Sequence, residues 1–446
     1  MNAATGMKDQ FFALAEHAIA QLKAREVLLA NFAGEVTDFV RFNQARVRQP
    51  LTVRQAVLSL SLIDGARRDN LALTLTGDVA QDRAAVSEAV TTLRRELASL
   101  PEDPYLLYCT EAATSTRETA GALPAPAEAI DAVMAAAGSA DLVGILASGP
   151  VCRGFASSLG ARHWHAVDAF LLDWSLYHST DKAVKSAWAG SQWNRAELQQ
   201  RMDAAREQLA HLSQPPRTLA PGEVRAYLSP AAVDELMAML SWGGVSDKAQ
   251  RTKQSCIQRL ADGEAQLSPQ ITLREDAGGG LAPAFDGAGF TRPTQVTLVE
   301  GGRHAGSLVS PRTAREYGVE ANGAEDDEGL QSLAMAPGAL PEAEVLAALD
   351  TGLFIGNLHY LNFSDRAGGR ITGLTRFATF WVERGRIVAP VNVMRFDDTL
   401  YRVLGPHLEA LTDTPQWMMD SGTYGQRSVR TSRVTGALLS KFALTL

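Results

Sequence analysis

Two long stretches in which apolar and polar residues alternate constrain the fold of this chain more than any other feature. The first, residues 55–77, reads QAVLSLSLIDGARRDNLALTLTG and contains a polar turn at residues 64–70. The second, residues 141–190, contains a corresponding polar turn at His178–Lys182. Because successive side chains of a strand point to opposite faces of a sheet, each stretch predicts antiparallel strands with one buried face.

Segments with helical spacing of apolar residues flank both stretches. They are residues 8–31, 78–100, 126–137 and 195–212. Gly77 and Gly190 close the two strand pairs at corresponding places. The repeated order of helix, strands and helix predicts an internal duplication in the amino-terminal region. The alternative is that two unrelated hairpins share this pattern, because β-hairpins have similar sequence signals in general.

The segment LSQPPRTLAPGE, residues 212–223, is rich in proline and glycine and is the best candidate for a linker. The chain has 446 residues, which exceeds the ~250 at which a single core tends to stop growing. We therefore expect two domains, 1–217 and 218–446. Beyond the linker, strand patterns dominate and helices stand apart from them, so an α+β fold with a β-rich carboxyl-terminal domain is predicted.

Charge and cysteine content exclude several classes of protein. The formal net charge is -8 and no lysine- or arginine-rich run occurs, which disfavours direct binding to nucleic acid. The amino-terminal segment lacks the pattern of a signal peptide, and no run of ~18 apolar residues predicts a membrane span. Cys109, Cys152 and Cys256 form no C-x-x-C pair, which argues against disulfides and a thiolate zinc site. A cytoplasmic protein with reduced thiols is expected.

Histidines provide the few candidates for chemistry. On a strand, His163 and His165 project from one face and could share a metal ion with a third ligand such as Asp168. Since two ligands alone make a poor site, the simpler interpretation is partly exposed histidines beside Trp164. His359 is a lone histidine on an alternating strand, predicted to line a groove or to be satisfied in the core. The chain contains neither an H-E-x-x-H helix nor a G-x-S-x-G nucleophile elbow.

One predicted helix carries very few ionisable groups. In LSPAAVDELMAMLSWGG, residues 228–244, Ser229 fits the N-cap and Pro230 fits the first helical position. Apolar residues recur at helical spacing as far as Leu240, and no ionisable residue follows the first two turns.

Several motifs in colinear order resemble the TldD/PmbA family of bacterial proteins, once called modulators of DNA gyrase, in which PmbA is also known as TldE. The segments concerned are VCRGFASSLGARHWHAVDAFLLDWSLY (151–177), DKAVKSAWAG (181–190), AFDGAGF (284–290), SPRTAREYG (310–318) and TGLTRFATFWVERGRIVAPV (372–391). The resemblance implies two α+β domains with a duplicated amino-terminal region. It also implies a heterodimer in which a TldD subunit carries zinc and cleaves peptides, while the TldE subunit lacks the zinc helix and completes the substrate channel.

This resemblance suggests a reason for the sparsely charged helix. TldD-type members carry a His-Glu-x-x-x-His element there, and its places correspond here to about Ala238, Met239 and Gly243. A methyl group, a thioether and a hydrogen neither bind zinc nor relay a proton. TldD-type members also use a late cysteine ligand, whereas the last cysteine here is Cys256. The resemblance therefore implies a TldE-like chain without a cofactor, and zinc in its partner. The segment 357–376 departs from the family pattern, which indicates a divergent subfamily.

The leading hypothesis is a subunit that pairs with a TldD-like zinc peptidase and binds unfolded or leader peptides. A peptide would add to an exposed strand edge through main-chain hydrogen bonds. The candidate groove residues, all on or beside predicted strands, are His359, Tyr360, Asn362, Arg376 and Arg395. The simpler explanation of each arginine is an ordinary surface charge on a strand.

Two further hypotheses stay open. In one, the chain is an independent enzyme whose site uses His163 and His165, or His359 with Arg376. In the other, it is a homodimeric peptide-binding or scaffold protein without a peptidase partner. Zinc bound by the chain alone would favour the first, and a stable homodimer without cleavage would favour the second.

Overall fold

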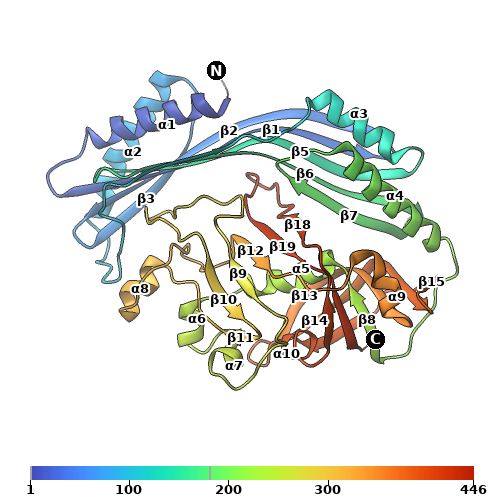
Figure 1. Ribbon diagram of the computed structural model, residues 1–446. Coiled ribbons are helices and arrows are strands. Elements are labelled where there is room, and N and C mark those ends of the chain that lie inside the picture. Colours follow the sequence, from blue (N-terminus) through green and yellow to red (C-terminus); the bar gives the residue numbers. More distant parts are fainter. Residues whose placement is uncertain (1–2, 180–181, 446) are drawn as a thin grey trace.

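The computed structural model describes residues 3–179 and 182–445, in which one curved sheet lies over a second, β-rich part (Figure 1). The strand order of the curved sheet is β3-β2-β1-β5-β6-β4. β7 also pairs with β6, so that β4 and β7 pair with successive segments of the same edge of β6. The strands are β1 (Glu26–Asn43), β2 (Arg46–Asp64), β3 (Arg67–Thr74), β4 (Thr114–Thr119), β5 (Asp141–Ser157), β6 (Arg162–Ser179) and β7 (Lys182–Gly190).

Four helices lie on the convex face of this sheet (Figure 1). They are α1 (Ala3–Ile19), α2 (Val79–Leu97), α3 (Pro126–Ala137) and α4 (Arg195–Leu212). The order of helix, three strands and helix occurs twice, and the two units meet at the antiparallel pair β1–β5. This confirms the predicted duplication and the α+β class. The predicted turn at His178–Lys182 falls partly on residues 180 and 181, which lie outside the described residues.

The predicted first helix, residues 8–31, was too long. α1 ends at Ile19, and β1 begins at Glu26. Leu28 belongs to the cluster beneath α1 and α2, whereas Leu29 clusters with Phe155 on the opposite face of the sheet. Because both faces are covered here, neighbouring residues are both apolar and the alternation that marks a strand is lost.

The second part contains two further sheets. One has the order β11-β10-β9-β12-β19-β18. In the other, β13, β8, β20, β16 and β14 pair in a closed ring because β13 also pairs with β14. The strands of the first are β9 (Leu273–Glu275), β10 (Val296–Glu300), β11 (Arg303–His304), β12 (Ser332–Met335), β18 (Gln416–Met419) and β19 (Thr431–Val434). Those of the second are β8 (Gly222–Leu228), β13 (Gly352–Asp365), β14 (Arg370–Glu383), β15 (Arg386–Pro390), β16 (Arg395–Thr399), β17 (Leu408–Leu411) and β20 (Ala437–Leu444).

Short helices connect these strands. They are α5 (Pro230–Ala238), η1 (Met239–Ser241), α6 (Asp247–Arg251), α7 (Gln258–Ala261), α8 (Pro311–Tyr317), η2 (Glu342–Glu344), α9 (Val345–Leu349) and α10 (Leu400–Val403). Among the residues that the structure describes, no helix has both the length and the apolarity needed to cross a bilayer.

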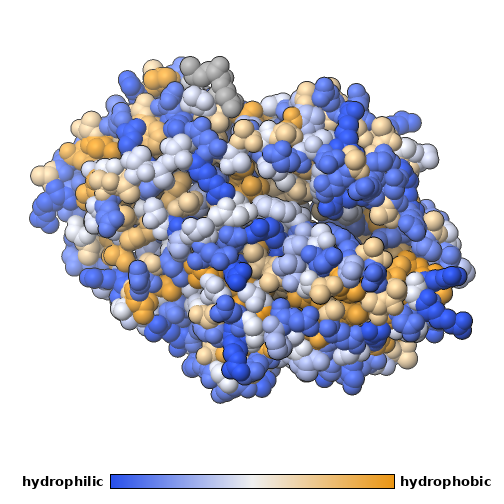
Figure 2. Space-filling model, in the orientation of Figure 1, coloured by the Kyte–Doolittle hydropathy of each residue, from blue (hydrophilic) through white to orange (hydrophobic). Residues whose placement is uncertain are grey.

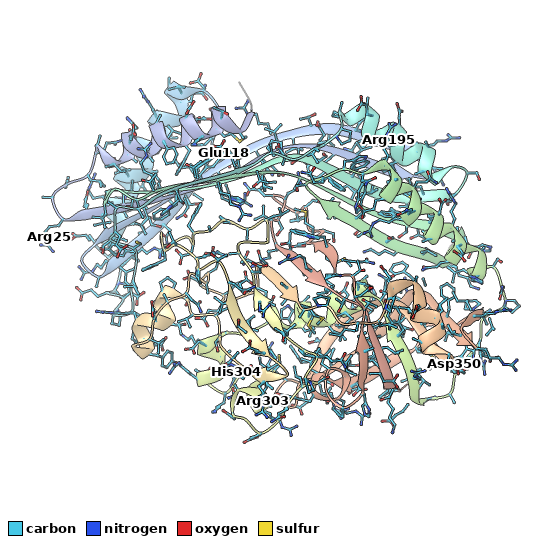
Figure 3. The ribbon with its side chains drawn as sticks, viewed as in Figure 1. Arg25, Glu118, Arg195, Arg303, His304 and Asp350 are labelled. Atoms are coloured by element: carbon cyan, nitrogen blue, oxygen red, sulfur yellow. The ribbon has the colours of Figure 1, made fainter. Side chains whose placement is uncertain are left out.

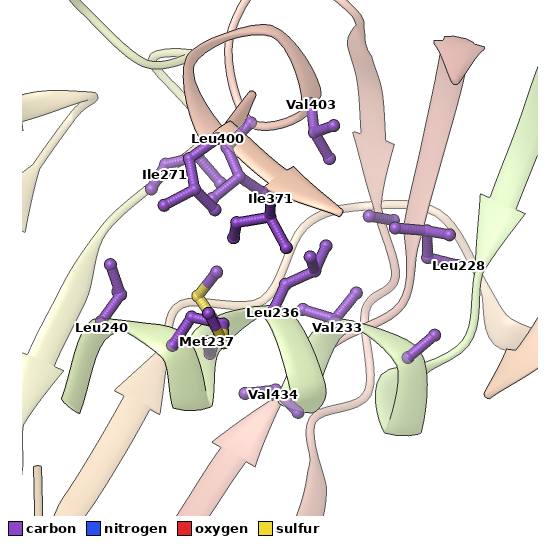
Figure 4. Close-up of a cluster of buried hydrophobic side chains, with 14 of the residues drawn as sticks. Leu228, Val233, Leu236, Met237, Leu240, Ile271, Ile371, Leu400, Val403 and Val434 are labelled. Atoms are coloured by element: carbon purple, nitrogen blue, oxygen red, sulfur yellow. The ribbon is translucent and has the colours of Figure 1, made fainter. Parts of the chain in front are cut away.

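The sparsely charged helix is α5, which lies in the core of the second part (Figure 4). Ser229 caps it: its hydroxyl accepts a hydrogen bond from Ala232 N at 3.3 Å and donates one to Gly356 O at 2.6 Å. Leu236 and Met237 are at most 2% exposed. The few charges of this helix are therefore explained by burial, because ionised side chains are rarely placed in a core.

The concave face of the curved sheet packs directly onto the second part (Figures 1 and 3). Val151 and Leu171 of the sheet cluster with Leu281 and Met419 of the second part. Arg427, which is 3% exposed, donates hydrogen bonds to Gly149 O, Ala169 O and Thr37 Oγ1 at 2.7 to 3.3 Å. The two parts thus share an apolar interface with a buried guanidinium group in it.

Candidate functional site

A cavity of about 950 Å³ lies between the two parts of the molecule. β7 and α4 contribute one side, and α5, β13 and β18 contribute the other. Figure 2 shows the surface hollowed between the upper and lower parts, on the side where α4 and β7 lie. We call this cavity the groove. Its size is at the upper end of the range for sites that bind small molecules, and it is open to solvent.

Three strands line the groove with consecutive residues rather than alternate ones. These runs are 184–187 of β7, 356–359 of β13 and 416–419 of β18. Within the described residues, β7 pairs only with β6, β18 pairs only with β19, and β13 leaves β8 after Ile355. Each strand therefore turns one unpaired edge of main-chain N–H and C=O groups toward the groove. Ser186 and Ala187 have small, half-buried side chains beside this edge, whereas Gly356 O already accepts a hydrogen bond from Ser229 Oγ.

Charged side chains from five elements, β6, β7, α4, α5 and η2, line the groove. Lys185 Nζ lies 3.4 Å from Asp173 Oδ2, and Arg201 lies 2.9 Å from Glu197 Oε1. Burial raises the pKa of the Asp173 carboxyl, and Lys185 opposes this shift. These two ion pairs come from β6, β7 and α4, on the upper side of the groove.

The only ionisable residues of α5, Asp234 and Glu235, face the groove. Ser432 donates a hydrogen bond to Asp234 Oδ1. Burial raises the pKa of Asp234, partly offset by this bond. Burial and the neighbouring Asp234 also raise the pKa of Glu235, whereas Lys185 lowers it. Both carboxyls are therefore held in an environment that disfavours their charge.

His359 is placed at the groove, on its β13 wall. Its ring contacts that of Tyr360 edge to face at 4.5 Å between centroids. Burial and the nearby cations Arg376 and Lys185 lower the pKa of His359, so its imidazole is neutral at physiological pH. Tyr360 is 79% exposed with φ of 54°, because β13 bulges between His359 and Asn362.

The remaining predicted groove residues lie outside the lining. Arg376 stands opposite Asn357 on the neighbouring strand, exposed and close to His359. Asn362 and Arg395 are exposed farther along β13 and on β16, where Arg395 Nε donates to Thr372 Oγ1 at 3.1 Å. The structure therefore brings His359, Tyr360 and Arg376 together and leaves Asn362 and Arg395 apart from them. Their roles stay predictions.

The interpretation of His163 and His165 as partly exposed was wrong, since both are at most 1% exposed. The rings face the second part: His163 stacks on Phe285 at 5.2 Å, and His165 Nε2 bonds to Leu281 O at 2.8 Å. Asp168 cannot be their third ligand, because it is an odd number of residues away on the same strand and points to the other face. Burial lowers the pKa of both histidines, that of His165 to about 4.

A second cavity, of about 350 Å³, lies beneath β1 and β5 beside the loop AFDGAGF. Asp286 of this loop is 2% exposed. Its Oδ1 accepts hydrogen bonds from Ala288 N and Phe290 N at 2.9 Å, while its Oδ2 has no partner among the described residues. Burial, together with the charge of Glu325, raises the pKa of Asp286 to about 7.

Comparison with known proteins identifies the second part. Residues 221–439 match the family described as the PmbA/TldA metallopeptidase C-terminal domain. A putative modulator of DNA gyrase from Thermotoga maritima has the same fold at 15% identity and a TM-score of 0.75, with 99% of this chain and 100% of that chain covered. TldE from Thermococcus kodakarensis gives 14% identity, a TM-score of 0.73 and coverage of 99% and 100%. The second part of the chain belongs to the TldD/PmbA family.

A third similar structure is that of a putative modulator of DNA gyrase from Bacteroides thetaiotaomicron. It is 14% identical, with a TM-score of 0.73 and 98% of each chain covered. No protein with a curated description matches this chain significantly. At this level of identity the solved structures establish the fold of the whole chain, and the family match concerns its second part.

The residues that correspond to the zinc helix of TldD-type members do not form a ligand set here. Ala238 is the last residue of α5, Met239 is buried in the core, and Gly243 follows η1 with φ of 85°. None of the three lines the groove. If the His-Glu-x-x-x-His spacing is placed four residues earlier in the sequence, it falls on Asp234, Glu235 and Met239. Of these three residues, only Asp234 and Glu235 line the groove. Within the described ranges, no three His, Cys, Asp or Glu side chains are grouped to hold a metal ion.

Sequence reasoning missed the carboxyls of α5 and the β7 wall. Asp234 and Glu235 were counted only as charges in the first two turns of a sparsely charged helix. Their signal is positional: they are adjacent polar residues on a helix whose other positions are apolar. No local signal marks the free edge of β7, since a strand pattern does not tell which neighbours pair.

Proposed function

We propose that this chain is a TldE/PmbA-like subunit that binds unfolded or leader peptides in the groove and pairs with a TldD-like zinc peptidase. The observation that carries the proposal is the convergence of three unpaired strand edges, from β7, β13 and β18, on one groove. An extended peptide satisfies such edges by forming main-chain hydrogen bonds, whatever its side chains are. We assign proteolysis to the partner, because the described residues, those of α5 included, do not group a set of zinc ligands.

Proline substitutions in β7 test the binding mode. In an antiparallel pair, successive residues direct their N–H groups to opposite sides of the strand. Of Ser186 and Ala187, which lie opposite Trp174 and Asp173, one therefore donates to β6 and the other faces the groove. We expect one of Ser186→Pro and Ala187→Pro to keep the stability of the parent while losing affinity for an unfolded peptide. The other should lose stability, because it breaks a bond within the sheet.

The affinity is measured by fluorescence anisotropy of a labelled unfolded peptide, with thermal denaturation of each variant alongside. Losing one main-chain hydrogen bond weakens binding by roughly 3- to 10-fold. Ala72→Pro is the matched control, because Ala72 lies on β3, the opposite edge strand of the same sheet. If both β7 variants bind the peptide as the parent does, or if the parent binds none, the proposal is wrong.

The partner is tested by affinity purification of the tagged chain from its own cell, followed by metal analysis. Recovery of a TldD-like chain that contains zinc and cleaves the bound peptide supports the proposal. Recovery of a homodimer without cleavage favours a scaffold protein instead. Zinc bound by this chain alone, and lost in the variant His163→Ala/His165→Ala, would favour an independent enzyme. The burial of both histidines counts against that outcome.

A further inference from the structure

The charges that line the groove do not balance. Its carboxylates are Asp173, Glu197, Asp234, Glu235 and Glu342, and its cations are Lys185 and Arg201. Two carboxylates form ion pairs with the two cations, Asp173 with Lys185 and Glu197 with Arg201. The other three have no ion pair within the described part of the chain. The groove thus contains three uncompensated carboxylates in a protein-walled space.

These three carboxylates lie on two walls. Asp234 and Glu235 belong to α5, behind the strand edge of β18. Glu342 belongs to η2, and Gln416 at the start of β18 donates a hydrogen bond to its Oε1 at 2.7 Å. A strand that pairs with β18 would therefore pass close to carboxylates from both walls. Since side chains of a strand alternate in direction, every second residue of such a peptide is able to reach them.

The surroundings of Asp234 and Glu235 also favour a positive ligand. Desolvation by the surrounding protein raises the pKa of both carboxyls, and a neighbouring carboxylate adds to this effect, Asp420 at Asp234 and Asp234 at Glu235. An ammonium or guanidinium group that enters the groove replaces the lost water and offsets the repulsion. A carboxylate that enters the same space would instead lose its own water and add to the repulsion among the negative charges.

We infer that the groove selects peptide segments that carry lysine or arginine, with Asp234, Glu235 and Glu342 as the residues that determine this specificity. The inference rests on the proposed function, because it concerns the same groove. The main-chain edges supply affinity for any extended peptide, and the carboxylates supply the choice among sequences.

The test uses three labelled peptides of equal length that differ only at two alternate central residues, which are lysine, glutamine or glutamate. We expect the parent chain to bind the lysine peptide on the order of tenfold more tightly than the glutamate peptide at low salt, with the glutamine peptide between them. Added salt should reduce this ratio, because it screens charges at an open site.

Two variants assign the preference to these residues. Asp234→Asn/Glu235→Gln keeps the shape of both side chains, and we expect it to bring the ratio close to one while glutamine-peptide binding persists. Glu342→Gln, at an exposed residue that does not risk folding, should reduce the ratio partially. Glu88→Gln, on the distant helix α2, serves as the matched control and should leave the ratio unchanged.

The outcomes separate this inference from the proposed function. If no peptide binds to the parent chain, the proposed function fails and this inference fails with it. If all three peptides bind equally, the proposed function stands and the inference is overturned. A preference for the lysine peptide that survives in both groove variants would also overturn it, because the carboxylates would then not be its source.

Discussion

Replacing Asp286 with asparagine should stabilise the protein at alkaline pH and not at acidic pH. Asp286 lies in the loop AFDGAGF, with Oδ1 held by two main-chain N–H groups and Oδ2 buried without a partner among the described residues. Its folded-state pKa, about 7, is above the ordinary value of 3.8. Between these values the folded chain keeps a proton that the unfolded chain has lost, so the free energy of unfolding falls as pH rises.

The magnitude follows from the same two values. A rise from 3.8 to about 7 spans about three pH units, so at ~1.36 kcal/mol for each unit the ionised carboxylate destabilises the fold by on the order of 4 kcal/mol. In Asp286→Asn the amide oxygen keeps both main-chain bonds, but its NH₂ group takes the place of the unpartnered Oδ2 at a cost of ~1–3 kcal/mol. We therefore expect the variant to be more stable than the parent by ~1–3 kcal/mol at about pH 8.

The measurement is urea denaturation of both proteins across a pH series from about 4 to 8. Taking the difference between the two proteins removes the contribution of every other titrating group. The difference should favour the parent by ~1–3 kcal/mol near pH 4 and should shift in favour of the variant until it levels off above about pH 7. A difference that stays constant with pH, or that grows in favour of the parent, would refute the argument that burial governs Asp286.

Two further substitutions test the packing of the fold. Gly289→Ala should destabilise the protein by ~1–3 kcal/mol, because Gly289 has φ of 89° and an added Cβ would lie 2.5 Å from the ring of Phe155. Thermal denaturation measures this effect, and an unchanged melting temperature would contradict the prediction. Leu236→Ala should cost ~2–5 kcal/mol, because the side chain is 2% exposed in the core around α5. Ala238→Ser, at an exposed position of the same helix, is its control and should change stability by at most ~0.5 kcal/mol.

Local patterns predicted those parts of the fold in which one face of an element is buried. The alternation in residues 55–77 corresponds to the end of β2, where residues 55–60 alternate between half-buried and buried, and to β3, where residues 70, 72 and 74 are exposed. The prediction failed at residues 28–30, which are buried from both sides and lack alternation. Strands of the second part are as short as two residues in β11 and three in β9. The pairing of β9 joins segments distant in sequence, so no local pattern determines its register.

The candidate site was predictable only in part, for a related reason. His359 was expected as a groove or core residue, and it lines the groove. His163 was misread because the loop that covers it, around Phe285, lies more than a hundred residues away in the sequence. The groove is made where β7, β13 and β18 come together, and which edge of a strand stays unpaired is decided by tertiary structure alone.

The buried hydrogen bonds of Arg427 affect how far the two parts that enclose the groove are able to move apart. Its guanidinium group bonds to residues of β1, β5 and β6 from a segment between β18 and β19, and so it ties the roof of the groove to its floor. Separating the curved sheet from the second part would leave the buried guanidinium group of Arg427 without its hydrogen-bond partners, which is energetically costly. This buried group would resist widening of the groove, so under the proposed function the entropy lost on binding would come mainly from the peptide. Under the proposed function such rigidity would suit peptides that are already unfolded, since only a segment free of structure would enter a groove that does not widen.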